Sequence, residues 1–215
     1  MRLLDTKTLK LYEFFGSNIP PYAILSHTWG DGEVSFQEMQ SGDAGSKAGY
    51  EKVKRCCEIA AAGGFQYAWV DTCCIDKTSS SELSEAINSM YLWYKDSGVC
   101  YAYLSDVPSI DLQAVQEIRG SVPFRQSRWF TRGWTLQELL APDELVFYAQ
   151  DWTKIGPRSS LESLIKEITR IPLPEWRGAC VAQIMSWASG RETTRSEDAA
   201  YCLMGLFGVN MPLLY

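Results

Sequence analysis

The residues best suited to chemistry lie in the stretch SRWFTRGWTLQELLAP, residues 127–142, where Glu138 stands among aromatic and leucine side chains. Trp134 and Glu138 are four residues apart, so a helix places both on one face. A carboxyl group beside an indole at a pocket edge is desolvated, which raises its pKa. Such an acid can bind a sugar hydroxyl or stabilise a developing positive charge. The alternative is that Glu138 is a solvated helix residue or a partner for Arg132.

Further polar and aromatic side chains stand where two expected strands end. The candidates for substrate binding near these strand ends are Ser26, His27, Trp29, Asp31 and Asp71. His27 is the single histidine of the chain, and a histidine at a strand end also serves as a hydrogen-bonded structural residue. Asp71 and Asp76 flank TCCI and can bind a ligand hydroxyl, but Asx residues also cap turns. Both interpretations stay open.

A third candidate is a set of arginines that precedes Glu138 in the sequence. Arg125, Arg128 and Arg132 lie among aromatic residues and can hold a phosphate group. The same mixture also occurs on helix faces with stacked arginines. The sequence contains neither a G-x-G-x-x-G motif nor a Walker loop, so nothing supports a dinucleotide or P-loop site of the usual kind.

The elements that must position these residues alternate between strands and helices. Apolar strands are predicted over residues 22–29, 65–74, 98–107 and 144–152. Helices are predicted from residue 50 to the Gly63-Gly64 stop, and behind a Ser79–Glu82 capping box. Two further helices are expected over residues 159–171 and 193–208, the second with a Thr194–Glu197 capping box. This order predicts an α/β fold, a flavodoxin-like parallel sheet with helices on both faces, plus a helical C-terminal subregion.

The fold class suggests where a site lies. In open doubly wound sheets, ligands bind beyond the carboxyl ends of the strands, where the strand order reverses. A flavodoxin-like order puts this point between the first and third predicted strands. We therefore expect the loop over residues 26–31 to approach the segment that carries Trp134 and Glu138.

Composition bounds the function. The 215 residues carry a net charge of −6, which disfavours a protein that tracks a nucleic-acid backbone. The charged start MRLLDTKTLKL and the lack of a long apolar run predict a cytoplasmic protein without a membrane span. The seven cysteines include the adjacent pairs Cys56-Cys57 and Cys73-Cys74, without C-x-x-C spacing. We expect reduced core cysteines, no disulfide and no metal.

Four motifs in order resemble one family. YAILSHTWGD, WVDTCCIDK, RGWTLQELLAP and SWASGRETTRSEDAAYCLMGLFGVNMPLLY are similar to the fungal heterokaryon-incompatibility (HET) domain. The resemblance implies a cell-death effector in self/non-self recognition. It also implies one domain over residues 1–215, with an α/β core over 1–155 and a helical extension over 156–215, within a larger protein. Expected partners are a second copy of the domain, an incompatibility partner or an attached oligomerisation module.

HET domains in turn look like distant relatives of Toll/interleukin-1 receptor (TIR) domains. The stretch W-T-L-Q-E-L is similar to a plant TIR motif whose Glu is essential for cleaving NAD, with Glu138 at the matching position and Thr135 in place of a Cys. This likeness implies that Glu138 is catalytic, that NAD or a related nucleotide is the substrate, and that no cofactor is needed. The rival hypothesis is a non-enzymatic module that signals death by assembly.

Overall fold

The structure, a computed structural model, describes residues 1–16, 18–109 and 122–213. The strands are β1 (Arg2–Asp5), β2 (Leu11–Glu13), β3 (Tyr22–His27), β4 (Tyr67–Trp69), β5 (Val99–Tyr103), β6 (Leu145–Tyr148) and β7 (Lys154–Pro157). The helices of the first half are α1 (Phe36–Ser41), α2 (Tyr50–Ala62), α3 (Asp71–Cys74) and α4 (Ser80–Lys95). The later helices are α6 (Val122–Arg125), α7 (Thr135–Leu140), α8 (Glu162–Thr169), α9 (Val181–Ala188), α10 (Asp198–Tyr201) and α11 (Met204–Phe207).

The described strands form one sheet in the order β2-β1-β4-β3-β5-β6-β7. Its centre, β4-β3-β5-β6, is parallel and consists of the four predicted strands. Numbered along the chain as predicted, their order is 2-1-3-4, so the flavodoxin-like arrangement is confirmed. The edges were not predicted: β1 and β2 add an antiparallel hairpin beside β4, and β7 pairs antiparallel with β6. These edge strands have three or four residues each, too few to show a clear alternation.

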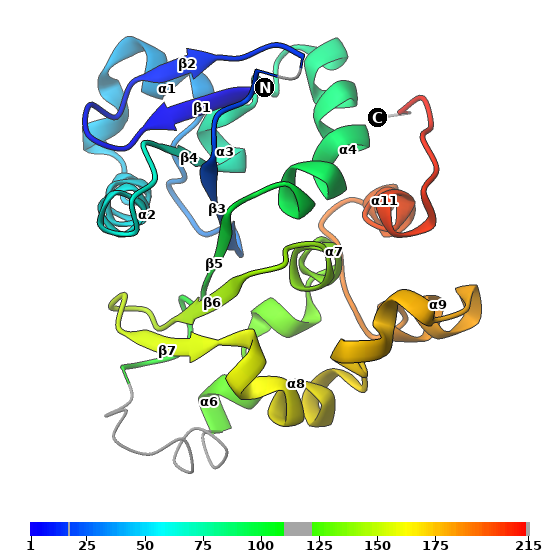
Figure 1. Cartoon of the computed structure of the whole chain (residues 1–215). Coiled ribbons are helices and arrows are strands. Elements are labelled where there is room, and N and C mark those ends of the chain that lie inside the picture. The colour runs from blue at the N-terminus through cyan, green and yellow to red at the C-terminus, as the bar shows by residue number, and fades with distance from the viewer. Residues whose placement is uncertain (17, 110–121, 214–215) are drawn as a thin grey trace.

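Helices cover both faces of the sheet, as predicted. Figure 1 shows α2 on one side and α4 and α7 on the other. Each long helix turns one stripe inward: α2 buries Val53 and Ala60 among others, and α4 buries Ile87 and Tyr94. The C-terminal helices pack back on this core. A Cβ atom at residue 205 in α11 would lie 2.1 Å from the Cβ atom of Tyr91 in α4, so the close approach requires glycine.

Two local predictions need correction. The second predicted strand, 65–74, ends at Trp69, and residues 71–74 form the short helix α3. A continuous apolar run is compatible with either strand or helix, so its period could not locate the change. The Thr194–Glu197 capping box does not form: Glu197 precedes α10 without a side-chain cap, and the Thr194 hydroxyl accepts a hydrogen bond from Arg132.

The Ser79–Glu82 capping box forms by half. The Ser79 hydroxyl accepts a hydrogen bond from the Glu82 amide, as predicted. The Glu82 carboxylate instead accepts from the Asp76 amide and pairs with Arg2 of β1. The carboxylate that the local sequence pattern assigned to the cap therefore pairs with a residue distant in the sequence instead.

The expected boundary between the α/β core and the helical extension, between residues 155 and 156, falls inside β7.

The cysteines behave as core residues, as predicted, with one exception. Cys180 is exposed, and the other six are buried. Burial raises the pKa of Cys57 and of Cys202 to about 12 each, so both thiols stay protonated at neutral pH. Within the described residues, no group of three His, Cys, Asp or Glu side chains could hold a metal ion. In the same part of the chain, no helix has the length and apolar character to cross a bilayer. The absence of a metal and of a disulfide stays a prediction.

Candidate functional site

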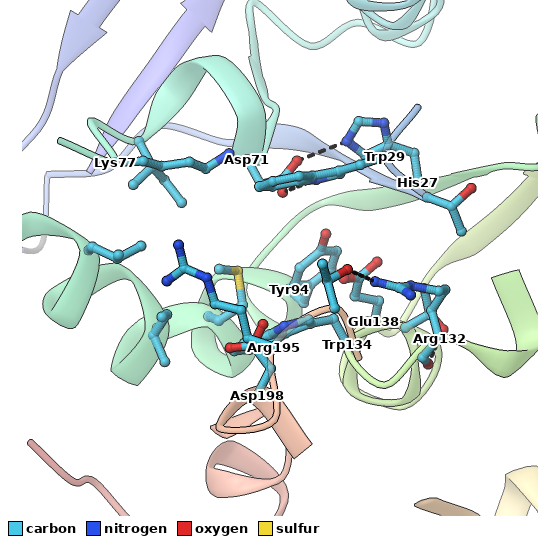
Figure 2. Close-up of a pocket in the computed structure, with 17 residues that line it drawn as sticks. His27, Trp29, Asp71, Lys77, Tyr94, Arg132, Trp134, Glu138, Arg195 and Asp198 are labelled. Atoms are coloured by element: carbon cyan, nitrogen blue, oxygen red, sulfur yellow. Dashed lines mark hydrogen bonds and ion pairs between the residues drawn. The ribbon is translucent and has the colours of Figure 1, made fainter. Parts of the chain in front are cut away.

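A pocket of about 270 Å³ opens at the carboxyl ends of β3 and β4, on the face covered by α4 and α7. Six of the predicted site residues line it: His27, Trp29, Asp71, Arg132, Trp134 and Glu138. Figure 2 shows them on two facing walls, with His27, Trp29 and Asp71 on one and Arg132, Trp134 and Glu138 on the other. The topology thus brings the loop after the first predicted strand to the Glu138 segment, as the sequence predicts.

The other two predicted residues do not line this pocket. Ser26 is fully buried behind Glu138, and its hydroxyl donates a 2.5 Å hydrogen bond to Glu138 Oε2. Asp31 is exposed beyond the pocket. The arginine set is also separated: Arg125 is ion-paired with Glu167 at 2.7 Å, while Arg132 lines the pocket. Ser26 therefore contacts Glu138 and does not line the pocket.

Glu138 is a buried acid. Glu138 is only 7% exposed, so it is not a solvated helix residue. It is not paired with Arg132 either, because the Arg132 guanidinium donates to the Thr194 hydroxyl. Burial raises the pKa of Glu138 to about 8; the Ser26 hydrogen bond opposes the rise, and the nearby Asp71 charge adds to it. Trp134 lies one helical turn away. The carboxyl group is therefore mostly protonated at neutral pH in the unliganded pocket.

The facing wall is organised by Asp71. One carboxylate oxygen lies 2.9 Å from His27 Nε2, and the other accepts a 2.7 Å hydrogen bond from Trp29 Nε1. Lys77 Nζ lies 3.8 Å from the Trp29 ring centroid. Burial disfavours the Asp71 carboxylate, but Lys77, His27 and Trp29 more than offset this, so its pKa lies well below the usual range. Asp71 is thus an ionised anchor for a histidine and a tryptophan.

Asp76 has the other role that the sequence allowed for aspartates here. Its carboxylate accepts hydrogen bonds from the amide and the hydroxyl of Thr78, which closes a turn. It does not line the pocket. The two aspartates that flank TCCI therefore differ: Asp71 faces the pocket and Asp76 fixes the turn behind it.

The third side of the pocket comes from residues 191–198, the C-terminal strap. Its Glu192 forms a parallel bridge to Arg132, with the Gly133 amide donating to the Glu192 carbonyl at 2.8 Å. A Cβ atom at residue 133 would lie 2.5 Å from Thr193 Cγ2, so the strap approaches this closely only over glycine. Arg191 donates 2.9 Å hydrogen bonds to the Arg132 carbonyl and to Thr135 Oγ1. The strap therefore fixes the start of α7.

Several pocket residues were not predicted. They are Thr28, Ile75, Lys77, Leu83, Ile87, Met90, Tyr94, Thr135, Thr194, Arg195 and Asp198. Lys77 is the last residue of the motif WVDTCCIDK, and this position was the available signal for it. Tyr94 lies in α4, and its hydroxyl donates to the Leu25 carbonyl. Arg195 and Asp198 gave no local signal, because their segment reads as the start of a helix.

The comparisons with known proteins agree with the motifs. Residues 22–123 match the family model described as Heterokaryon incompatibility protein (HET). The chain is 48% identical over 204 residues to the Vegetative incompatibility protein HET-E-1 of Podospora anserina; the match covers 92% of this chain and 15% of that protein. No solved structure is significantly similar to the chain. The chain belongs to the heterokaryon-incompatibility (HET) domain family.

Proposed function

We propose that this domain is a cell-death effector of fungal heterokaryon incompatibility, and that it acts by cleaving the N-glycosidic bond of NAD or a related nucleotide in the pocket. The similarity to a vegetative incompatibility protein supports the biological role. The observation that supports the chemistry is the buried Glu138 carboxyl group, which faces a cavity between Trp29 and Trp134. The likeness of its motif to the TIR catalytic helix supports the same assignment.

The pocket has the composition that such a substrate needs. Small-molecule sites are mostly apolar, with a few convergent polar groups, and hold roughly 300–1,000 Å³. At about 270 Å³, this cavity suits one nucleoside unit, with the rest of a dinucleotide at its mouth. Trp29 and Trp134 offer faces for a planar base, and Lys77 and Arg132 are cations suited to the phosphates.

The reaction needs little from the protein besides electrostatics. The C1′–N bond breaks and its electron pair moves to the ring nitrogen of nicotinamide. Nicotinamide thereby becomes neutral and leaves. The ribosyl ring becomes an oxocarbenium-like cation, which the Glu138 carboxylate stabilises. Water then adds to C1′, and its proton passes to Glu138 or to solvent. The products are nicotinamide and ADP-ribose.

The protonation state of Glu138 sets one condition on this mechanism. With a pKa of about 8, the free carboxyl group is mostly neutral at pH 7. A bound nicotinamide ring carries a positive charge, and an opposite charge nearby favours the ionised carboxylate. Substrate binding therefore ionises Glu138, so the negative charge is present when the bond breaks.

The test measures nicotinamide release from NAD by the purified domain held as a dimer by a fused dimerisation module. Glu138→Gln keeps the size of the side chain and an oxygen that accepts from Ser26, but it removes the charge. We expect a loss of about 3 kcal/mol of transition-state stabilisation, roughly a hundredfold in rate or more. Glu144→Gln, an exposed residue outside the pocket, is the matched control and should keep the full rate.

The same variants expressed in fungal cells separate catalysis from signalling by assembly. Cell death that depends on Glu138 but not on Glu144 supports the enzymatic proposal. A folded Glu138→Gln protein that kills at the wild-type rate would show that the domain acts by assembly, without this carboxylate.

A further inference from the structure

A buried chain of hydrogen bonds ends on Glu138. Trp129 Nε1 lies 2.7 Å from Ser26 Oγ, and Ser26 Oγ lies 2.5 Å from Glu138 Oε2. Trp129 is 1% exposed and Ser26 is fully buried. These hydrogen bonds connect three parts of the fold: the segment before α7, the end of β3, and α7 itself.

The direction of this chain follows from its first member. An indole N–H can donate a hydrogen bond but cannot accept one. Trp129 therefore occupies one of the two acceptor sites of the Ser26 hydroxyl, and the hydroxyl hydrogen points at Glu138. A donor aimed at a carboxyl oxygen favours the ionised form. Without the indole N–H, the hydroxyl could turn its hydrogen away.

We propose that Trp129 is a positioning residue for Glu138: through Ser26 it fixes one carboxyl oxygen and favours the carboxylate. The catalytic consequence depends on the proposed function, but the hydrogen-bond chain itself does not. Trp129 does not line the pocket, so its effect on a ligand passes through Glu138.

Other groups also act on this carboxyl and must be held constant. The titratable or charged groups around Glu138 are Asp71, Tyr94, Cys100, Arg191 and Cys202, with His27, Lys77, Arg132, Arg195 and Asp198 also lining the pocket. None of them is changed by a substitution at Trp129 or Ser26.

Trp129 also packs in the core, which a control must separate from its N–H. Its ring makes edge contacts with Phe130 and Phe147. Trp129→Phe keeps an aromatic ring there and removes the donor. Trp69 gives the matched control, because it is fully buried among aromatic rings, and its Nε1 has no hydrogen-bond partner within the described residues. Trp69→Phe therefore has a similar packing cost and removes an N–H group that makes no hydrogen bond within the described residues.

The experiment follows the Glu138 carboxyl carbon by NMR in ¹³C-glutamate-labelled protein from acidic to alkaline pH, with its signal assigned by its loss in Glu138→Gln. We expect the wild-type pKa to be about 8. Trp129→Phe should raise it, and Ser26→Ala should raise it by about one unit. Trp69→Phe should leave it unchanged. An equal pKa in the wild type and Trp129→Phe, or the same rise in both Phe variants, would overturn the proposal.

A second measurement needs no substitution at Trp129, and so remains valid if that variant fails to fold. The indole N–H signal of Trp129 in the ¹⁵N spectrum of the wild type should shift with the same midpoint as the Glu138 carboxyl. In Glu138→Gln this transition should disappear. A Trp129 N–H signal whose chemical shift does not change over the pH range in which Glu138 titrates would overturn the proposal.

Kinetic measurements on the same variants then test whether these hydrogen bonds affect the proposed reaction. Trp129→Phe should move the midpoint of the pH profile of kcat/KM to higher pH. The value of kcat/KM at the high-pH limit should stay within a few fold of the wild type. Ser26→Ala should lower kcat/KM at pH 7 roughly tenfold, in line with a pKa higher by about one unit. If the NMR shifts occur but the domain releases no nicotinamide, the proposed function fails and the hydrogen-bond chain stands.

Discussion

The Ser26 hydroxyl and the Glu138 carboxyl meet at 2.5 Å, although 112 positions separate the two residues in the sequence. Ser26 lies in β3 and Glu138 in α7, which follows β5 in the chain. β3 and β5 are adjacent parallel strands, so their carboxyl ends reach the same edge of the sheet. This contact shows how the strand order makes a site from two distant motifs.

The raised pKa of Glu138 predicts that Glu138→Gln stabilises the protein at neutral and alkaline pH. Below about pH 4.5, the carboxyl is protonated in both the folded and the unfolded chain, and it contributes nothing. Between about 4.5 and 8, the unfolded chain ionises while the folded one stays protonated, so wild-type stability falls by up to about 1.4 kcal/mol per pH unit from this group. Glutamine avoids that loss.

Thermal melting of both proteins between about pH 4 and pH 8 checks this. The melting temperature of Glu138→Gln should rise relative to the wild type as pH increases. Glu144→Gln, with an exposed side chain, should show no such trend. A Glu138→Gln variant that loses stability relative to the wild type at pH 8 contradicts the buried neutral acid.

The pH dependence of the reaction should differ between its two kinetic constants. The profile of kcat/KM reports groups in the free enzyme, so it should rise with pH to a plateau above about 8, as Glu138 loses its proton. The profile of kcat reports the substrate complex, where the positive nicotinamide ring favours the carboxylate, so its midpoint should be lower. Steady-state rates of nicotinamide release across this range give both. Two profiles with the same midpoint would exclude ionisation of Glu138 by the bound substrate.

Asp71→Asn should weaken substrate binding and lower the pKa of Glu138. Asparagine has one carbonyl acceptor, so it cannot keep both the Trp29 and the His27 hydrogen bonds with the same strength. We expect KM to rise about tenfold, equivalent to about 1.4 kcal/mol. Loss of the Asp71 charge removes a repulsion that raises the Glu138 pKa. Asp76→Asn, in the turn behind the pocket, is the control and should change neither quantity.

Arg191→Met should destabilise the strap and raise the pKa of Glu138. The side chain keeps much of its length but loses two 2.9 Å hydrogen bonds to the start of α7, and a positive charge that favours the Glu138 carboxylate. The loss of these two hydrogen bonds costs about 1–3 kcal/mol, or a fall of several degrees in Tm. Arg177→Met, at an exposed ion pair with Asp143, is the control and should change Tm little. Equal melting of the two variants would argue against a structural strap.

Activity should depend on association of the domain with itself. The proposed function motivates this expectation: it rests on the resemblance of the W-T-L-Q-E-L motif to TIR domains, which generally act after they associate. The specific activity of the unfused domain should rise with protein concentration, and a fused dimerisation module should raise it at low concentration. The measurement is nicotinamide release per domain across a wide dilution series, beside sedimentation of the same samples. A specific activity that stays constant while the oligomeric state changes would contradict it.

The sequence by itself determined the central architecture and singled out six residues that line the pocket, Glu138 among them. Four apolar runs separated by helical stripes were enough for the parallel core, because strand burial and helix periodicity are local patterns. The strand order came from the flavodoxin-like fold class that this alternation suggested. Glu138 among aromatic residues was unusual in its own neighbourhood, so it was found without a structure. The edge strands β1, β2 and β7 were missed, because three or four residues carry too little pattern.

Only the tertiary structure decided what surrounds that acid. Asp71 and Ser26 looked alike in sequence, as polar residues near strand ends, yet one anchors Trp29 and His27 at the pocket and the other is buried behind Glu138. Arg195 entered the pocket through a strap far along the chain. The physical reason is that a pKa, a hydrogen-bond partner and a pocket wall depend on distance in space. Neighbours in sequence do not specify that distance until the sheet is assembled.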